Sequence, residues 1–115
     1  MPIHELTSDN FDLQLQQHDL LVIDFCADWC KPCKAFEKIM LEVEPNFPGV
    51  LFGRVNVEKQ KMLAEEFAVR SVPYVMIIRK QTALYADSGV LSAKDLRDML
   101  TQAQLLSPEQ LLQEK

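Results

Sequence analysis

The feature that most constrains the fold is an almost unbroken apolar run at residues 20–26, interrupted only by Asp24. Such a run is typical of a β-strand that helices cover on both faces, as in a parallel sheet. From residue 31 the apolar positions change to helical spacing, with one face formed by Phe36, Ile39, Met40 and Val43. A buried strand followed directly by an amphipathic helix predicts an α/β protein.

The other segments continue this alternation. Strands are expected at residues 3–6, 50–57, 74–79 and 83–87, and helices from residue 11, around 62–69 and from 93 to 103. Too few residues separate the last two strands for a helical crossover, so these should pair antiparallel. The predicted order is β-α-β-α-β-α-β-β-α, a single mixed sheet with helices on both faces.

A chain of 115 residues fits one compact domain, which we assign to residues 1–106. Beyond it, Ser107-Pro108-Glu109 has the pattern of an N-cap with a first-turn proline, and two leucines follow. We therefore expect residues 107–115 to form a short C-terminal helical extension, to which the sequence assigns no function.

Charge and composition narrow the possible partners. The formal net charge is -5 and no run of lysine or arginine occurs, which favours neither nucleic acid nor an anionic membrane surface. No segment approaches the roughly 20 apolar residues of a membrane span, and the N-terminus lacks the pattern of an export signal. Three cysteines, an odd number, fit a reducing compartment. We expect a cytoplasmic monomer whose partners are proteins.

The segment Trp29-Cys30-Lys31-Pro32-Cys33 lies where the second helix should begin. Thiol chemistry requires a thiolate, which the N–H groups and positive dipole end of a helix N-terminus stabilise. Cys30 is placed to attack a disulfide, and Cys33 to resolve the mixed disulfide that results. Pro32 suits a first helical turn, and the charge of Lys31 favours the thiolate further.

Two other functions compete with this interpretation. A CxxC pair is also half of a tetrahedral zinc site, for which Cys26, His4 and His18 are the remaining candidate ligands. None of these three forms a second close pair, so no metal site is predicted. The second alternative is a redox-independent interaction module that uses the fold only to bind a partner.

Several motifs together resemble the thioredoxin family. They are Val22-Ile23-Asp24-Phe25, then the segment at residues 27–34 with its Cys-Lys-Pro-Cys centre, and Ser71-Val72-Pro73 downstream. Further matches in the same order are Phe11, Asn56 and Gly89. The resemblance covers nearly the whole chain. It implies the thioredoxin fold and a protein-disulfide reductase active in electron transport and cell redox homeostasis, with no cofactor besides its redox-active disulfide and with a thioredoxin reductase as partner.

The resemblance also implies roles for individual residues. A carboxyl in an apolar strand must be hydrogen-bonded, paired or raised in pKa, and in this family the aspartate matching Asp24 serves Cys33 as general base. Val72-Pro73 matches a cis-proline loop that faces the cysteines and pairs with extended substrate. With Trp29 and Gly89, these two residues would form the substrate-binding surface. A satisfied core aspartate and a trans proline are the alternatives.

Four positions depart from the family pattern. Arg54 stands where lysine is frequent, and because a guanidinium keeps its proton, its catalytic role is doubtful. Cys26 replaces a common tryptophan and is expected to act as a small buried hydrophobe in an altered pocket, with an auxiliary redox role as the alternative. Lys31 replaces a glycine and Lys38 a helix-kinking proline, which leaves the redox potential open.

Overall fold

The computed structural model describes residues 2–106, whose elements follow the predicted order. The strands are β1 (Ile3–Glu5), β2 (Leu20–Cys26), β3 (Leu51–Asn56), β4 (Tyr74–Arg79) and β5 (Thr82–Ser88). The helices are α1 (Phe11–Gln17), α2 (Lys31–Val43), the short 3-10 helix η1 (Glu44–Asn46), α3 (Lys61–Glu66) and α4 (Ala93–Leu105). The predicted extension at 107–115 lies outside the described residues.

The five strands form one mixed sheet in the order β1-β3-β2-β4-β5. β3 runs parallel to both β1 and β2, whereas β4 pairs antiparallel with β2 and with β5. Every residue of β2 is buried, because this strand has neighbours on both edges and helices over both faces. The mixed sheet and the antiparallel pairing of the last two strands are therefore confirmed.

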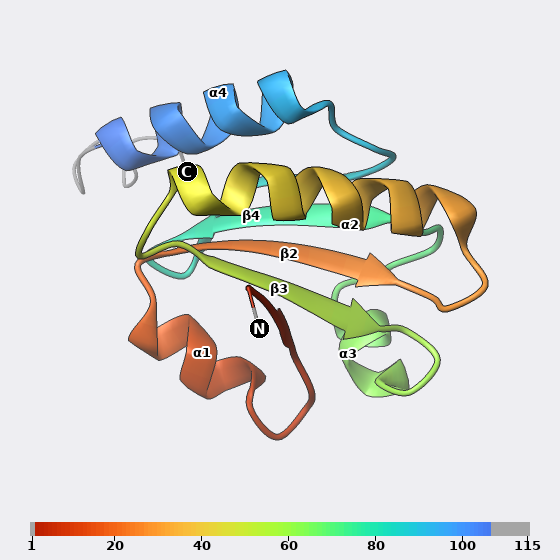
Figure 1. The fold of residues 1–115 in the computed structure, drawn as a ribbon. Coiled ribbons are helices and arrows are strands. Elements are labelled where there is room, and N and C mark those ends of the chain that lie inside the picture. The colour runs from red at the N-terminus through yellow and green to blue at the C-terminus, as the bar shows by residue number, and fades with distance from the viewer. Residues whose placement is uncertain (1, 107–115) are drawn as a thin grey trace.

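Helices cover both faces of the sheet, with α2 and α4 on one side and α1 and α3 on the other (Figure 1). Alternate residues of β2 serve the two resulting cores. Val22 packs with Phe36 and Met40 of α2, whereas Ile23 and Phe25 join the core on the opposite face. The predicted apolar face of α2 is the buried one.

Gly53 in β3 is required by a close crossing of the chain. A Cβ added at this residue would lie 2.5 Å from Cδ1 of Leu6, which is buried directly over the strand. The absence of a side chain at Gly53 thus lets the segment after β1 pack against the sheet.

One helix boundary differs from the sequence-based expectation. α3 ends at Glu66 rather than near residue 69, and Ala68 has a left-handed φ of 54°. Asn10 precedes α1 but does not cap it with its side chain; its Oδ1 instead accepts a hydrogen bond from the Thr7 amide at 2.8 Å. No helix in residues 2–106 has the length and apolar character needed to cross a membrane.

Candidate active site

The two cysteines lie where the chain leaves the central strand and turns into α2. Cys30 is the N-cap of α2, in extended conformation, and its Sγ accepts a hydrogen bond from the Cys33 amide at 3.2 Å. Pro32 stands in the first turn, where its missing N–H removes no intrahelical bond. The sulfur of Cys30 therefore sits on the unpaired N–H groups of a helix start, as the sequence predicted.

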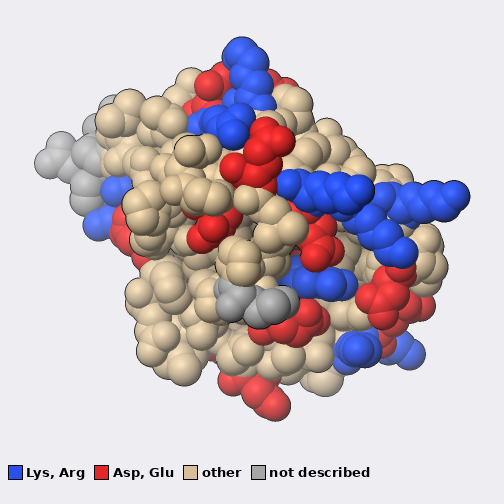
Figure 2. Space-filling view, viewed as in Figure 1, with Lys and Arg blue, Asp and Glu red and all other residues tan. Residues whose placement is uncertain are grey.

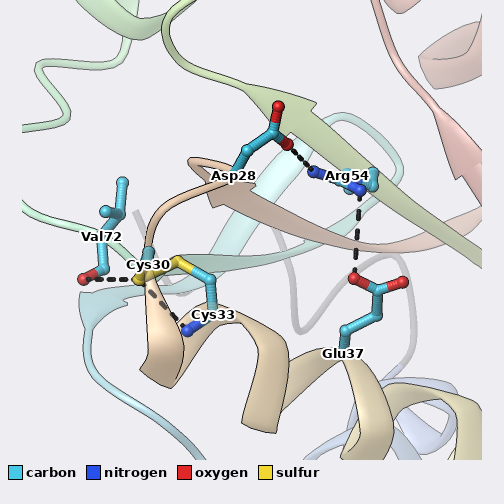
Figure 3. The surroundings of a disulfide bond; sticks show 6 residues. All are labelled: Asp28, Cys30, Cys33, Glu37, Arg54 and Val72. Atoms are coloured by element: carbon cyan, nitrogen blue, oxygen red, sulfur yellow. Dashed lines mark hydrogen bonds and ion pairs between the residues drawn. A yellow bond between two sulfur atoms is a disulfide. The ribbon is translucent and has the colours of Figure 1, made fainter.

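Cys30 and Cys33 are joined by a disulfide in this structure, and each is only 3% exposed. The Sγ of Cys30 lies 3.8 Å from the carbonyl oxygen of Val72, to which a thiol at this position can donate (Figure 3). The Val72-Pro73 peptide bond is cis, as the resemblance implied. The proline loop and the helix start thus meet at one sulfur, although they are 42 positions apart.

The residues expected to bind substrate surround this meeting point. Gly89, with a φ of 111°, donates its amide to the Pro73 carbonyl at 2.9 Å, so the turn after β5 is tied to the proline loop. Trp29 is 68% exposed beside Cys30, and Val72 is half-buried. Val90, which the sequence did not single out, adds a 43% exposed apolar side chain next to Gly89.

Asp24 is buried in β2, with 2% of its surface exposed. Because side chains alternate along a strand, it lies on the same face as Val22 and Cys26, which is the face that α2 covers. Its Oδ1 has no hydrogen-bond partner among the described residues.

Burial raises the pKa of Asp24 to about 7, and the positive charge of Arg54 opposes part of that rise.

Arg54 lies opposite Asp24 on the neighbouring strand and reaches three carboxylates. Its guanidinium nitrogens lie 3.4 Å from Asp28, 3.6 Å from Glu5 and 3.9 Å from Glu37. Figure 3 shows Arg54 between Asp28 and Glu37, on the other side of the disulfide from Val72. The arginine therefore connects the loop before the cysteines, α2 and β1.

The sequence did not single out Asp28 and Glu37. No local pattern marks them, because they approach each other only through Arg54 of another strand.

Cys26 is the remaining free cysteine of the described residues and is buried. Together with Cys33 and Arg54 it lines a cavity of about 280 Å³ between α2 and the sheet. Burial, and secondarily the charge of Asp24, raise the pKa of its thiol to about 11. A thiol with so high a pKa carries almost no thiolate near neutrality, which fits the expectation of a small buried hydrophobe.

The candidate zinc ligands are not assembled. His4 is exposed on β1, and His18 contacts the Gln14 carbonyl at the end of α1. Across residues 2–106, no three histidine, cysteine or acidic side chains are grouped so as to hold a metal ion. The arrangement can perform thiol-disulfide exchange with the two cysteines and the residues beside them.

Comparisons with known proteins agree with this geometry. A sequence model of the family described as Thioredoxin matches residues 2–102. The chain is 37% identical over 107 residues to a putative thioredoxin 2 of Streptomyces coelicolor, covering 93% of this chain and 80% of the relative. It is 31% identical over 100 residues to a thioredoxin of Buchnera aphidicola, covering 85% of this chain and 93% of that protein.

Solved structures show the same fold at lower identity. A mutant thioredoxin from Halobacterium salinarum superposes with a TM-score of 0.81 at 21% identity, over 91% of this chain and 93% of the other. Chloroplastic thioredoxin z superposes with a TM-score of 0.83, also at 21% identity, over 90% and 96% of the two chains. At this identity the likeness concerns the fold.

Proposed function

This chain belongs to the thioredoxin family and is a thiol-disulfide oxidoreductase, and from that premise we propose that it reduces disulfide bonds in other proteins. Cys30 is the attacking thiol and Cys33 the resolving one. A reducing compartment, the cytoplasm, is the setting that fits three cysteines without a disulfide framework.

The observation that supports this assignment of roles is the hydrogen bond from the Cys33 amide to Cys30 Sγ at 3.2 Å. In the reduced protein, the same N–H group at the start of α2 stabilises a Cys30 thiolate. Cys33 faces the cavity between α2 and the sheet, away from Val72. Its sulfur is therefore placed for an internal reaction rather than for a first attack.

The reaction balances in two exchanges. The Cys30 thiolate attacks one sulfur of the substrate disulfide, which forms a mixed disulfide and releases the other substrate sulfur as a thiolate that takes up a proton. Cys33 then loses its proton and attacks Cys30 Sγ, which closes the internal disulfide and frees the second substrate thiol. Two electrons have passed to the substrate. A flavin-dependent thioredoxin reductase, the partner that the family implies, then supplies two electrons to reduce the Cys30-Cys33 disulfide again.

Asp24 is proposed to take the proton that Cys33 loses in the second exchange. It lies on the face that α2 covers, and its pKa of about 7 lets the carboxyl both accept and return a proton near neutrality. An ordinary exposed aspartate, ionised well below pH 7, would be a much weaker base.

Substrate polypeptide is proposed to bind over Trp29, Val72, Pro73 and Gly89. Trp29 offers an exposed aromatic side chain, and the backbone of Val72-Pro73 lies beside Cys30, where an extended segment could pair with it. The tie between Gly89 and Pro73 keeps the two loops of this surface together.

The test uses a peptide that contains one disulfide. The purified chain is reduced and then freed of dithiol, and turnover is sustained by a flavin-dependent thioredoxin reductase, so that no small thiol attacks the peptide or the mixed disulfide. The wild-type chain should reduce the peptide, Cys30→Ser should lose turnover, and Cys33→Ser should accumulate a covalent mixed disulfide visible by mass. Cys26→Ser is the matched control and should keep turnover. Full turnover by Cys30→Ser would refute the mechanism.

The reduction potential of the Cys30-Cys33 pair tests the direction of electron flow. A value near the roughly -270 mV that is typical of thioredoxin supports reduction of substrates, whereas a value near -120 mV would identify an oxidant instead. An unchanged cellular phenotype when both cysteines become serine would favour the redox-independent interaction module.

A further inference from the structure

Three exposed lysines form a stripe along the outer face of α2, beginning beside the attacking cysteine. Lys31, Lys34 and Lys38 are all exposed, and at 100° per residue they fall within about 60° of the helix circumference. The buried face of the helix, which includes Phe36 and Met40, lies on the opposite side. We call these three residues the lysine stripe.

Within residues 2–106, the charge of the lysine stripe has no ion-pair partner. Across the described part of the chain, none of the three lysines lies within 4 Å of a carboxylate. Figure 2 shows basic side chains gathered over the right-hand part of α2.

The acidic residues of α2 are instead engaged by arginines from other elements. Glu37 turns to Arg54 at 3.9 Å, and Glu42 pairs with Arg97 at 3.5 Å. Asp28, in the loop before the helix, is likewise held by Arg54 at 3.4 Å. These contacts draw the carboxylates to the flanks of the helix and leave the ammonium groups of the lysine stripe facing solvent.

The lysine stripe runs away from the reactive sulfur in a defined direction. With a rise of 1.5 Å per residue, Lys34 stands about 6 Å and Lys38 about 12 Å along the helix axis from Cys30. A polypeptide bound by its disulfide at Cys30 would place residues a few positions from its cysteine over these ammonium groups. The screening length is about 8 Å at physiological ionic strength. Acidic side chains of that polypeptide would therefore be close enough to the lysine ammonium groups to be attracted by them.

Building on the proposed reductase function, we infer that the lysine stripe selects protein disulfides whose cysteines are flanked by acidic side chains. The net charge of -5 repels an acidic partner at long range, but that repulsion is screened beyond about 8 Å. The lysine stripe begins one residue from the attacking sulfur, inside that screening length. The partner chemistry is therefore an acidic polypeptide segment adjoining a disulfide.

The experiment compares two peptides of equal length, each with one disulfide, that differ only in carrying glutamate or lysine beside the cysteines. The measured quantity is the ratio of kcat/KM for the acidic peptide to kcat/KM for the basic one, at about 0.15 M salt. Any effect of a substitution on the thiols themselves acts on both peptides and cancels in this ratio.

The test variant is Lys34→Gln/Lys38→Gln, and the control is Lys80→Glu. Both change the net charge from -5 by two units, to -7. Lys80 follows the end of β4 that is opposite to Pro73, about 20 Å away along the strand. Lys31 is kept, because it also adjoins the attacking thiolate.

The wild-type ratio is expected to be about ten, the low end of electrostatic steering, and to approach one in about 1 M salt. The double variant should lose most of the preference, while Lys80→Glu should keep it. A wild-type ratio near one, or an equal loss in both variants, would overturn the inference while leaving the reductase function intact. Failure of the wild-type chain to reduce either peptide would overturn the reductase function and the inference with it.

Discussion

The buried carboxyl of Asp24 predicts an unusual dependence of stability on pH. Its pKa is raised from 3.8 to about 7 by burial, so the folded protein holds a proton that the unfolded chain releases between those values. Stability therefore falls as the pH rises from 4 to 7, because over that range the folded state binds more protons than the unfolded state. Above pH 7 the loss is complete and constant.

The size of the effect follows from the same shift. About three pKa units at 1.36 kcal/mol each give a penalty of about 4 kcal/mol, fully developed above pH 7 and absent below pH 4. Asp24→Asn removes the titrating group and hence this penalty. Relative to the wild-type chain, the variant should gain about 4 kcal/mol in free energy of unfolding between pH 4 and pH 8.

The assay is urea unfolding of both proteins at a series of pH values, with the Cys30-Cys33 disulfide kept oxidised so that no thiol of the pair titrates. The informative quantity is how the difference in free energy of unfolding between the two proteins changes with pH. A constant offset from burying an amide cancels in that change. Asp12→Asn, which removes an exposed carboxylate of α1, controls for the loss of one charge. Parallel curves for wild type and Asp24→Asn would refute the reasoning.

Three further outcomes are expected. Arg54→Met should raise the pKa of Asp24 further, because the arginine charge lowers it. In the same unfolding series, the loss of stability with rising pH should therefore be complete at a higher pH in this variant than in the wild-type chain. Cys26, whose pKa is raised to about 11, should resist iodoacetamide at pH 8 in the folded, reduced protein and react once urea unfolds it; peptide mass mapping would detect early labelling that contradicts this. Gly53→Ala should lower the free energy of unfolding by about 1–3 kcal/mol, since its Cβ would lie 2.5 Å from Leu6, and a smaller loss in the Leu6→Ala background would show that this contact is the cause.

Most of the fold was predictable because its signals are local. The apolar run of β2, the helical spacing in α2 and the short gap between β4 and β5 each follow from neighbouring residues. Ser92 caps α4 by accepting the Asp95 amide at 3.0 Å, and a serine three residues before an acidic residue is a local signal for a helix start. Local periodicity and caps therefore sufficed for the element order and for the start of the reactive helix.

Other details lacked a local signal. The β4-β5 turn consists of Lys80 and Gln81, both with positive φ, where asparagine and glycine are the residues that usually mark such a turn. From the sequence, Arg54 can be judged only by its residue type, and a guanidinium that keeps its proton argues against a role in proton transfer. Its contacts with three carboxylates form only after β1, β3 and α2 have packed together. Long-range electrostatic contacts of this kind need coordinates.

Cys30 and Val72 are in contact in the folded protein but are synthesised at different times. These residues are 42 positions apart, and Gly89 comes later still. A nascent chain therefore exposes both reactive cysteines before the loops that face them have been made. During that interval the thiols are present without the proposed docking surface, because Val72, Pro73 and Gly89 belong to the second half of the domain.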